Sequence, residues 1–102
     1  MKKIINGRLY NTNTAKCVGY FSNDLEYNDI NAFEEKLYRK KNGEFFLYGW
    51  GGANTEFAEK CGTRSWCSGE SIRPISINEA KEWAEENLSA DKYIDCFGDV
   101  DE

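Results

Sequence analysis

The sequence predicts an α+β fold, in which an antiparallel sheet of about four to five strands precedes two C-terminal helices packed on one face. Three observations support this class. The turn-forming pair Asn42-Gly43 separates two β-rich runs. Ser76 and Glu79 have capping-box spacing and precede apolar residues at helical intervals. A length of 102 residues with 40% hydrophobic residues fits a single domain over 1–102.

Two short strands are predicted near the N-terminus, over 4–10 and 16–22, joined by a polar turn at 11–14. An alternative places the first turn at Asn6-Gly7, a pair typical of two-residue hairpin turns. The first arrangement is preferred because a strand ending before Asn6 would be very short. The polar stretch 22–31 is predicted to be a loop.

The central prediction is a hairpin with Asn42-Gly43 as its two-residue turn, because both residues tolerate positive φ. That turn places Lys41 opposite Glu44 and Tyr38 opposite Leu47. Both hairpin faces then carry aromatic side chains and need a cover. Because the C-terminal helices can cover only one face, the other needs the N-terminal strands, a ligand or a partner, a second copy of the chain included.

A glycine-rich stretch, 49–53, leaves this hairpin. We expect it to lead into a short helix over 56–61 that ends at Gly62. The small-residue loop 62–69 then connects to an edge strand over 71–75.

The C-terminal helices have the strongest local signals. The first helix carries an apolar stripe at helical spacing, formed by Ile77, Ala80, Trp83, Ala84 and Leu88. Ser89 is placed to cap a second helix over 90–97, which buries Tyr93, Ile94 and Phe97 and ends at Gly98.

The composition narrows the classes of function that this chain could have. Histidine is absent, which removes the usual general acid–base and the commonest metal ligand. Residues 79–102 hold nine acids and two lysines, a net charge of −7, within a chain of net charge −5. An acidic chain without a basic stripe argues against direct nucleic-acid binding. We therefore expect no enzyme, no cofactor and no metal.

The compartment predicted from the sequence is the cytoplasm, with no membrane association. The N-terminal apolar run stops after two residues, and no apolar stretch is long enough to cross a bilayer. In a reducing cytosol the four cysteines are predicted to be free thiols; the alternatives are two disulfides or a zinc site. These residues are Cys17, Cys61, Cys67 and Cys96.

The leading functional hypothesis is that the helical carboxylates form a line of negative charge that occupies a basic groove on another protein. The predicted contacts are four acids and two apolar anchors: Glu79, Glu82, Glu86, Asp91, Trp50 and Trp66.

An alternative uses the loops between Gly49 and Trp66 to sequester a nucleotide signal. Glycines let a phosphate approach the backbone, and a guanidinium can bind it. The predicted ligand-binding residues are Gly51, Gly52, Asn54 and Arg64.

A third hypothesis is hydrolysis by two carboxylates that face each other across a cleft. The sequence does not indicate which two of the five candidates would pair: Glu34, Glu35, Glu56, Glu59 and Glu70.

Four segments, 9–12, 37–49, 51–53 and 79–86, together resemble a family of small acidic proteins carried by prophages and integrative elements of Firmicutes. The likeness spans nearly the whole chain. It implies a viral or mobile-element accessory protein, such as an anti-CRISPR inhibitor, whose partner is a bacterial defence protein with a basic surface. It brings no catalytic residues, and Cys61 and Cys67 belong to no motif of that family.

Overall fold

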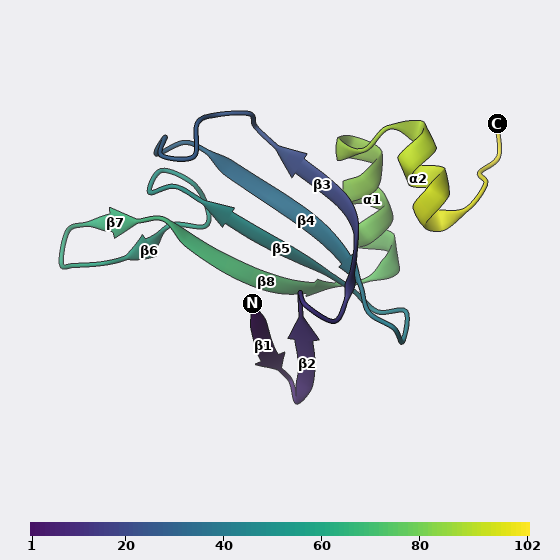
Figure 1. Ribbon diagram of the computed structural model, residues 1–102, viewed down its shortest axis with the longest axis horizontal. Coiled ribbons are helices and arrows are strands. Elements are labelled where there is room, and N and C mark those ends of the chain that lie inside the picture. Colours follow the sequence, from purple (N-terminus) through teal and green to yellow (C-terminus); the bar gives the residue numbers. More distant parts are fainter.

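The computed structural model describes residues 1–102 as three antiparallel sheets and two helices (Figure 1). The main sheet has the strand order β3-β4-β5-β8, flanked by a β1–β2 hairpin and a small β6–β7 hairpin. The elements are β1 (Lys2–Ile5), β2 (Arg8–Asn11), β3 (Lys16–Ser22), β4 (Phe33–Arg39), β5 (Phe45–Gly51), β6 (Glu59–Lys60), β7 (Trp66–Cys67), β8 (Gly69–Ile75), α1 (Ile77–Asn87) and α2 (Ala90–Phe97). This arrangement confirms the predicted α+β class, and β8 confirms the edge strand.

The N-terminal hairpin turns at Asn6-Gly7, so the preferred strand over 4–10 is wrong and the alternative is right. Both turn residues have positive φ, 52° for Asn6 and 77° for Gly7, as a two-residue hairpin turn requires. Tertiary contacts offset the shortness of β1. Tyr10 on β2 is 4% exposed, and the Thr12 amide donates to the Met1 carbonyl at 3.0 Å.

The central hairpin forms, but its predicted register is wrong by one residue. Tyr38 pairs with Phe46. The Lys40 amide donates to the Glu44 carbonyl at 2.7 Å, which leaves a three-residue loop in which Gly43 has φ of 91°. Asn42 does not take up a positive φ, because its side-chain oxygen accepts the Glu44 amide at 3.0 Å. A type I turn followed by a left-handed glycine is the commonest three-residue hairpin loop.

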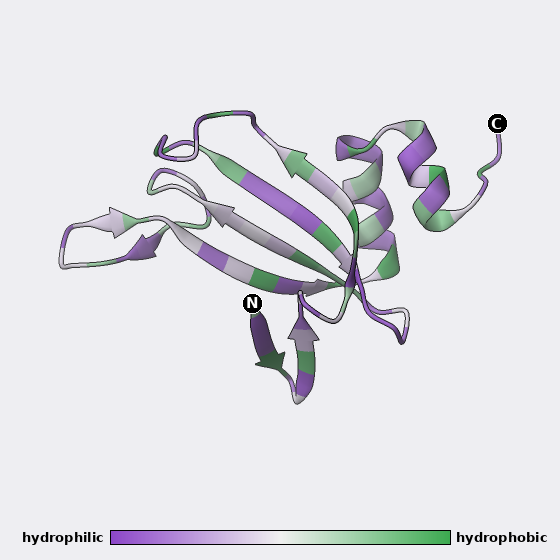
Figure 2. Cartoon of the chain, viewed as in Figure 1, coloured by the Kyte–Doolittle hydropathy of each residue, from purple (hydrophilic) through white to green (hydrophobic).

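One sheet face carries the main core, which α1 covers. Gly19 on β3 makes the close approach feasible, because a Cβ there would lie 2.8 Å from the Trp83 ring. In Figure 2, green and purple segments alternate along α1 and α2, as amphipathic helices require. The buried residues of this core are Leu37, Phe45, Leu47, Ala80, Trp83 and Ala84.

Both helices have the predicted caps. The Ser76 hydroxyl accepts the Glu79 amide and the Glu79 carboxylate accepts the Ser76 amide, each at 3.1 Å. Ser89 caps α2. The prediction that α2 buries Ile94 is wrong, since Ile94 is 37% exposed. Phe97 does reach the core, with its ring centroid 5.6 Å from that of Phe45.

The opposite sheet face has a second, smaller core. Tyr38 stacks on Phe46 with centroids 5.1 Å apart, and Tyr10 of the N-terminal hairpin packs edge-on against Phe46 at 5.6 Å. Ile72 of β8 completes the cluster. The N-terminal strands are therefore the cover for one end of this face. At its other end Tyr48 and Trp50 are only half-buried.

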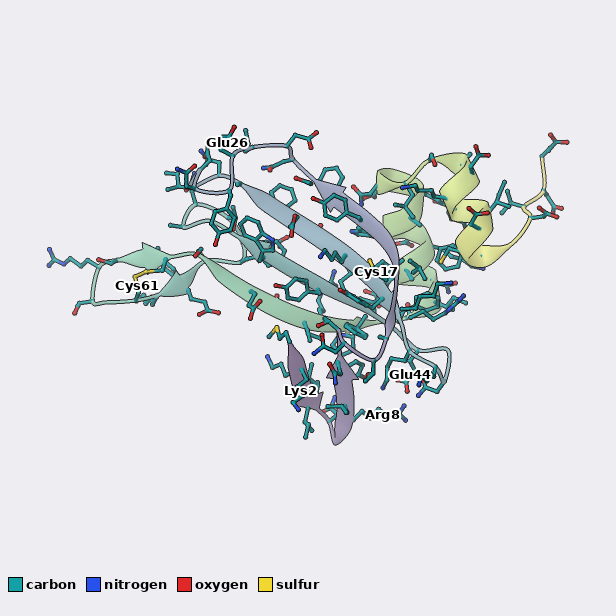
Figure 3. The ribbon with its side chains drawn as sticks, viewed as in Figure 1. Lys2, Arg8, Cys17, Glu26, Glu44 and Cys61 are labelled. Atoms are coloured by element: carbon teal, nitrogen blue, oxygen red, sulfur yellow. A yellow bond between two sulfur atoms is a disulfide. The ribbon has the colours of Figure 1, made fainter.

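The helix predicted over 56–61 does not form. A turn follows Thr55, and then β6 and β7 build a hairpin arm that projects away from the helices in Figure 1. Figure 3 shows the disulfide between Cys61 and Cys67 as a yellow bond in this arm. The free-thiol prediction is therefore wrong for this pair. Five intervening residues gave no pairing signal, because only the hairpin brings the two cysteines together.

Cys17 and Cys96 are free, as predicted. Cys17 is exposed, whereas Cys96 is a half-buried residue of α2 that packs against the main core. Burial raises the pKa of the Cys96 thiol, so this side chain behaves as a small apolar residue.

Candidate functional site

A loop over 23–32 lies beside the open end of the second sheet face. The Asn23 side chain closes its base by donating to the Asn31 carbonyl at 2.8 Å. The Gly52 amide donates to the Ala32 carbonyl at 2.8 Å and ties the loop to the exit of β5. The loop is therefore anchored at both ends.

Glycines in the 49–52 stretch are required for packing. A Cβ on Gly52 would lie 2.6 Å from the Ile30 carbonyl oxygen, so only glycine lets the loop rest there. The Phe57 ring occupies the space that side chains at Gly49 and Gly51 would need. These glycines therefore serve close packing within the chain.

A pocket of about 760 Å³ lies between this loop, the end of β5 and the base of the arm. Tyr48 and Trp50, two positions apart on β5, line it from the sheet. Tyr27 lines it from the loop, with its ring centroid 5.4 Å from that of Trp50 and the two planes 57° apart. Of these three aromatic side chains, only Trp50 was a predicted site residue.

Carboxylates are held in place around these rings. The Trp50 indole and the Tyr20 hydroxyl both donate to Glu34, the latter at 2.9 Å. The Tyr48 hydroxyl donates to Glu70. Burial, and then the hydrogen bond to Glu70, raise the pKa of Tyr48 far above its ordinary value. The hydrogen bond to Glu34 is the main cause that raises the pKa of Tyr20. Both phenols therefore stay protonated and act as donors.

The pocket is acidic. Asp29, Glu59 and Glu70 line it, and no lysine or arginine does. Lys36 lies on the same sheet face, where it pairs with Tyr48, but it does not line the pocket. This charge suits a cation and disfavours a phosphate.

The residues predicted for a nucleotide do not converge on this pocket. Gly51 is buried against Thr55, and the side-chain amide of Asn54 donates to the side-chain oxygen of Asn31 at 2.5 Å. Arg64 is exposed in the turn of the arm and does not line the pocket; of the four predicted residues, only Gly52 does. The nucleotide hypothesis stays a prediction. No basic side chain lines the pocket to bind a phosphate.

The residues predicted to bind a protein partner occupy three separate places. Glu82, Glu86 and Asp91 are exposed on the helices. Glu79 is on α1 too, but its carboxylate is engaged in the capping box and lies 3.7 Å from Arg73.

The two predicted tryptophan anchors lie elsewhere. Trp50 is on the sheet face opposite α1. Trp66 is 55% exposed on the arm, with Lys60 Nζ 5.8 Å from its ring centroid. The helical acids and the tryptophans therefore do not form one surface.

Among the five carboxylates considered for catalysis, Glu59 and Glu70 line the same pocket. Glu34 does not line the pocket, but it accepts a hydrogen bond from Trp50, which does. Glu35 is on the other face, where burial and the charge of Glu56 raise its pKa, opposed in part by the Trp83 indole. No group of three or more His, Cys, Asp or Glu side chains is arranged to hold a metal ion.

Sequence reasoning missed Tyr27, Tyr48 and Asp29. Tyr48 could have been found, because it stands two residues before Trp50 and strand alternation places both on one face. Tyr27 and Asp29 join the pocket through a loop whose path only the tertiary structure fixes.

Comparison with known proteins gives no family: no family model, no curated protein and no solved structure matches this chain. The class that the fold defines is an α+β domain with one helix-covered and one partly open sheet face. Neither helix has the length and apolar character needed to span a membrane.

Proposed function

We propose that this chain is a non-catalytic binding protein that blocks a basic partner protein by stoichiometric capture on the acidic surface of α1 and α2. The observation that carries the proposal is the arrangement of exposed acids on these two short helices. We define the acidic helical surface by Glu82, Glu85, Glu86, Asp91 and Asp95, all of which are exposed.

The acidic side of α1 has a fixed direction. Ala80, Trp83 and Ala84 are buried against the sheet, so the helix cannot rotate without exposing its core stripe. A charged surface on a rigid element loses little conformational entropy on binding. Complementary charge then speeds association with a basic partner and makes binding depend on salt.

Fold stability does not account for three of these acids. Glu85, Glu86 and Asp95 are in the last turns of their helices, where no basic residue accompanies them. A carboxylate there faces the negative end of the helix dipole, which is unfavourable by roughly 0.3–1 kcal/mol per charge. Binding to a basic surface would offset this cost, which supports a recognition role for the acids.

The class of partner follows from the sequence resemblance alone: a bacterial defence protein that a phage or mobile-element inhibitor would occupy, in the host cytoplasm. Cytoplasmic reductants would open the Cys61–Cys67 disulfide. Because the arm projects away from the helices, the acidic helical surface does not depend on that bond (Figure 1).

The test is an affinity capture from host lysate with three versions of the protein: wild type, a helical triple variant (Glu82→Lys, Glu86→Lys, Asp91→Lys) and a control triple variant (Asp24→Lys, Glu26→Lys, Glu56→Lys). All six positions are exposed, so both variants change the net charge equally. We expect a basic protein that wild type and control retain at low salt and that the helical variant loses. Equal capture by the two folded variants would contradict the proposal.

A further inference from the structure

We propose that the pocket beside Trp50 binds an arginine side chain presented by a partner protein. In this arrangement the guanidinium packs on the Trp50 and Tyr27 rings and hydrogen-bonds to Glu70 and Asp29. This site lies on the sheet face opposite α1, so it is separate from the acidic helical surface and does not rest on the function proposed for it.

The aromatic part of the pocket suits a planar cation. Tyr27 and Trp50 meet at 57° with centroids 5.4 Å apart, so the two rings are tilted and not stacked face to face. A guanidinium over the face of an aromatic ring is attracted by the ring's negative face, with tryptophan the best partner. Tyr27 is 83% exposed, and its ring is therefore accessible from solvent.

The acidic part supplies hydrogen-bond acceptors that the protein itself does not satisfy. Glu70 Oε2 accepts from Tyr48, whereas Oε1 makes no hydrogen bond. Asp29 Oδ1 accepts the Asn31 amide at 2.8 Å, whereas Oδ2 has no partner. An arginine offers five N–H donors in a fixed plane, and two carboxylates at different points of one pocket can share them.

The pocket is organised before any ligand arrives. Glu34 holds the Trp50 indole by its N–H, and Tyr48 holds Glu70. The loop carrying Tyr27 is tied to Gly52 through Ala32. Preorganised groups bind more tightly because little side-chain entropy is lost on complex formation.

The surroundings of the pocket indicate a protein, not a free metabolite, as the source of the arginine. Large apolar side chains of the same loop are exposed at the mouth of the pocket: Tyr27 by 83% and Ile30 by 59% within its lining, and Leu25 by 44% beyond it. A small cation would leave this rim in water. A partner surface around an inserted arginine would cover it, as the rim of a protein interface surrounds its central anchor.

The experiment follows the three tryptophan indole N–H resonances by NMR while capped peptides are added. The probes are acetyl-Leu-Arg-Leu-amide, its citrulline analogue, which is neutral and nearly isosteric, and agmatine, which carries the guanidinium without a peptide. We expect the Trp50 resonance to move with the arginine peptide, and to move at least ten times less at equal concentration with either of the other two. The Trp83 resonance should stay fixed, because this α1 side chain is buried between the helix and the opposite face of the sheet.

Two conservative variants assign the contact. Glu70→Gln should weaken binding of the arginine peptide at least fivefold, and Tyr27→Leu should weaken it while keeping the loop apolar. Glu86→Gln removes the same charge from the acidic helical surface and should leave binding unchanged. Each variant is checked for an unchanged amide spectrum outside the pocket.

Three results would overturn the inference: equal movement of Trp50 with arginine and citrulline peptides, unchanged affinity in Glu70→Gln, or agmatine binding as tightly as the peptide. The last would assign the pocket to a small cation. None of these outcomes bears on the lysate capture by the helices, and loss of that capture would leave the pocket titration untouched.

Discussion

Trp50 on β5 donates its indole N–H to Glu34, its cross-strand partner on β4. The bond joins a half-buried aromatic ring to a carboxylate that also accepts from Tyr20 on β3. Three adjacent strands are thereby linked on the face that α1 leaves uncovered. The same contacts hold the wall of the acidic pocket, so the sheet and the shape of the pocket depend on one carboxylate.

Replacing Glu34 should therefore destabilise the sheet. Glu34→Ala leaves the Trp50 and Tyr20 donors without their partner, and we expect a loss of about 1–3 kcal/mol in the free energy of unfolding. Glu34→Gln keeps an acceptor and should lose less than half of that. Urea unfolding followed by circular dichroism measures both. Glu26→Ala, at an exposed loop position, is the control and should stay within about 0.5 kcal/mol of wild type.

Gly19 allows α1 to approach the sheet, so Gly19→Ala should be costly. The added Cβ would meet the Trp83 ring at 2.8 Å and the Leu88 side chain at 3.1 Å. We expect about 1–3 kcal/mol of destabilisation from overpacking, seen as a lower thermal midpoint. Gly62→Ala is the matched control, since the nearest side-chain atom there lies 3.6 Å away. A thermal midpoint that falls equally in both variants would refute the packing argument.

Stability should depend on pH through Glu35. Burial raises the pKa of this carboxyl in the folded state, so the folded protein binds its proton more tightly than the unfolded chain does. Stability from this group is complete below the unfolded pKa of about 4.5 and is lost as pH rises through the higher folded pKa.

Glu35→Gln removes this ionisation. The variant should be more stable than wild type at pH 7, and the advantage should disappear near pH 3. Chemical denaturation at the two pH values measures the difference. Glu56→Gln, which removes the neighbouring charge, should give a smaller gain in the same direction, because burial is the larger cause of the shift. An equal effect of Glu35→Gln at both pH values would exclude the ionisation as its source.

Reducing the Cys61–Cys67 disulfide should loosen the arm and leave the core intact. Both cysteines are exposed, and the arm carries none of the buried residues of either core. We expect amide exchange to accelerate over 59–67 with the rest of the chain unchanged. The Cys61→Ser, Cys67→Ser double variant should reproduce this pattern without reductant. Faster exchange in β4 or β5 would show instead that the arm supports the sheet.

Local signals explain what could be predicted. The Ser76 capping box, the stripe through Ala80 and Trp83, and the glycine at 43 each act within a few residues, and each appears in the structure. The errors fall where distant contacts decide the outcome. The hairpin register differs by one residue because the Asn42 side chain accepts the Glu44 amide. The sequence is compatible with both a two-residue and a three-residue hairpin loop, and these loops give different registers.

The candidate site was predictable only in part. The exposed helical acids follow directly from the helix pattern. The pocket does not, because its walls come from residues 27–30, 48–53, 59 and 68–70, which share no sequence motif. In the same way, the cysteine spacing did not reveal the disulfide until β6 and β7 paired.

By itself the sequence determined the α+β class, the two capped helices and the direction of their acidic sides, because periodicity and capping depend on neighbours along the chain. Only the tertiary structure decided that the N-terminal hairpin covers Phe46 and that the Tyr27 ring lies beside that of Trp50. Those contacts join segments far apart in sequence, and their free energy arises from packing that no local pattern encodes.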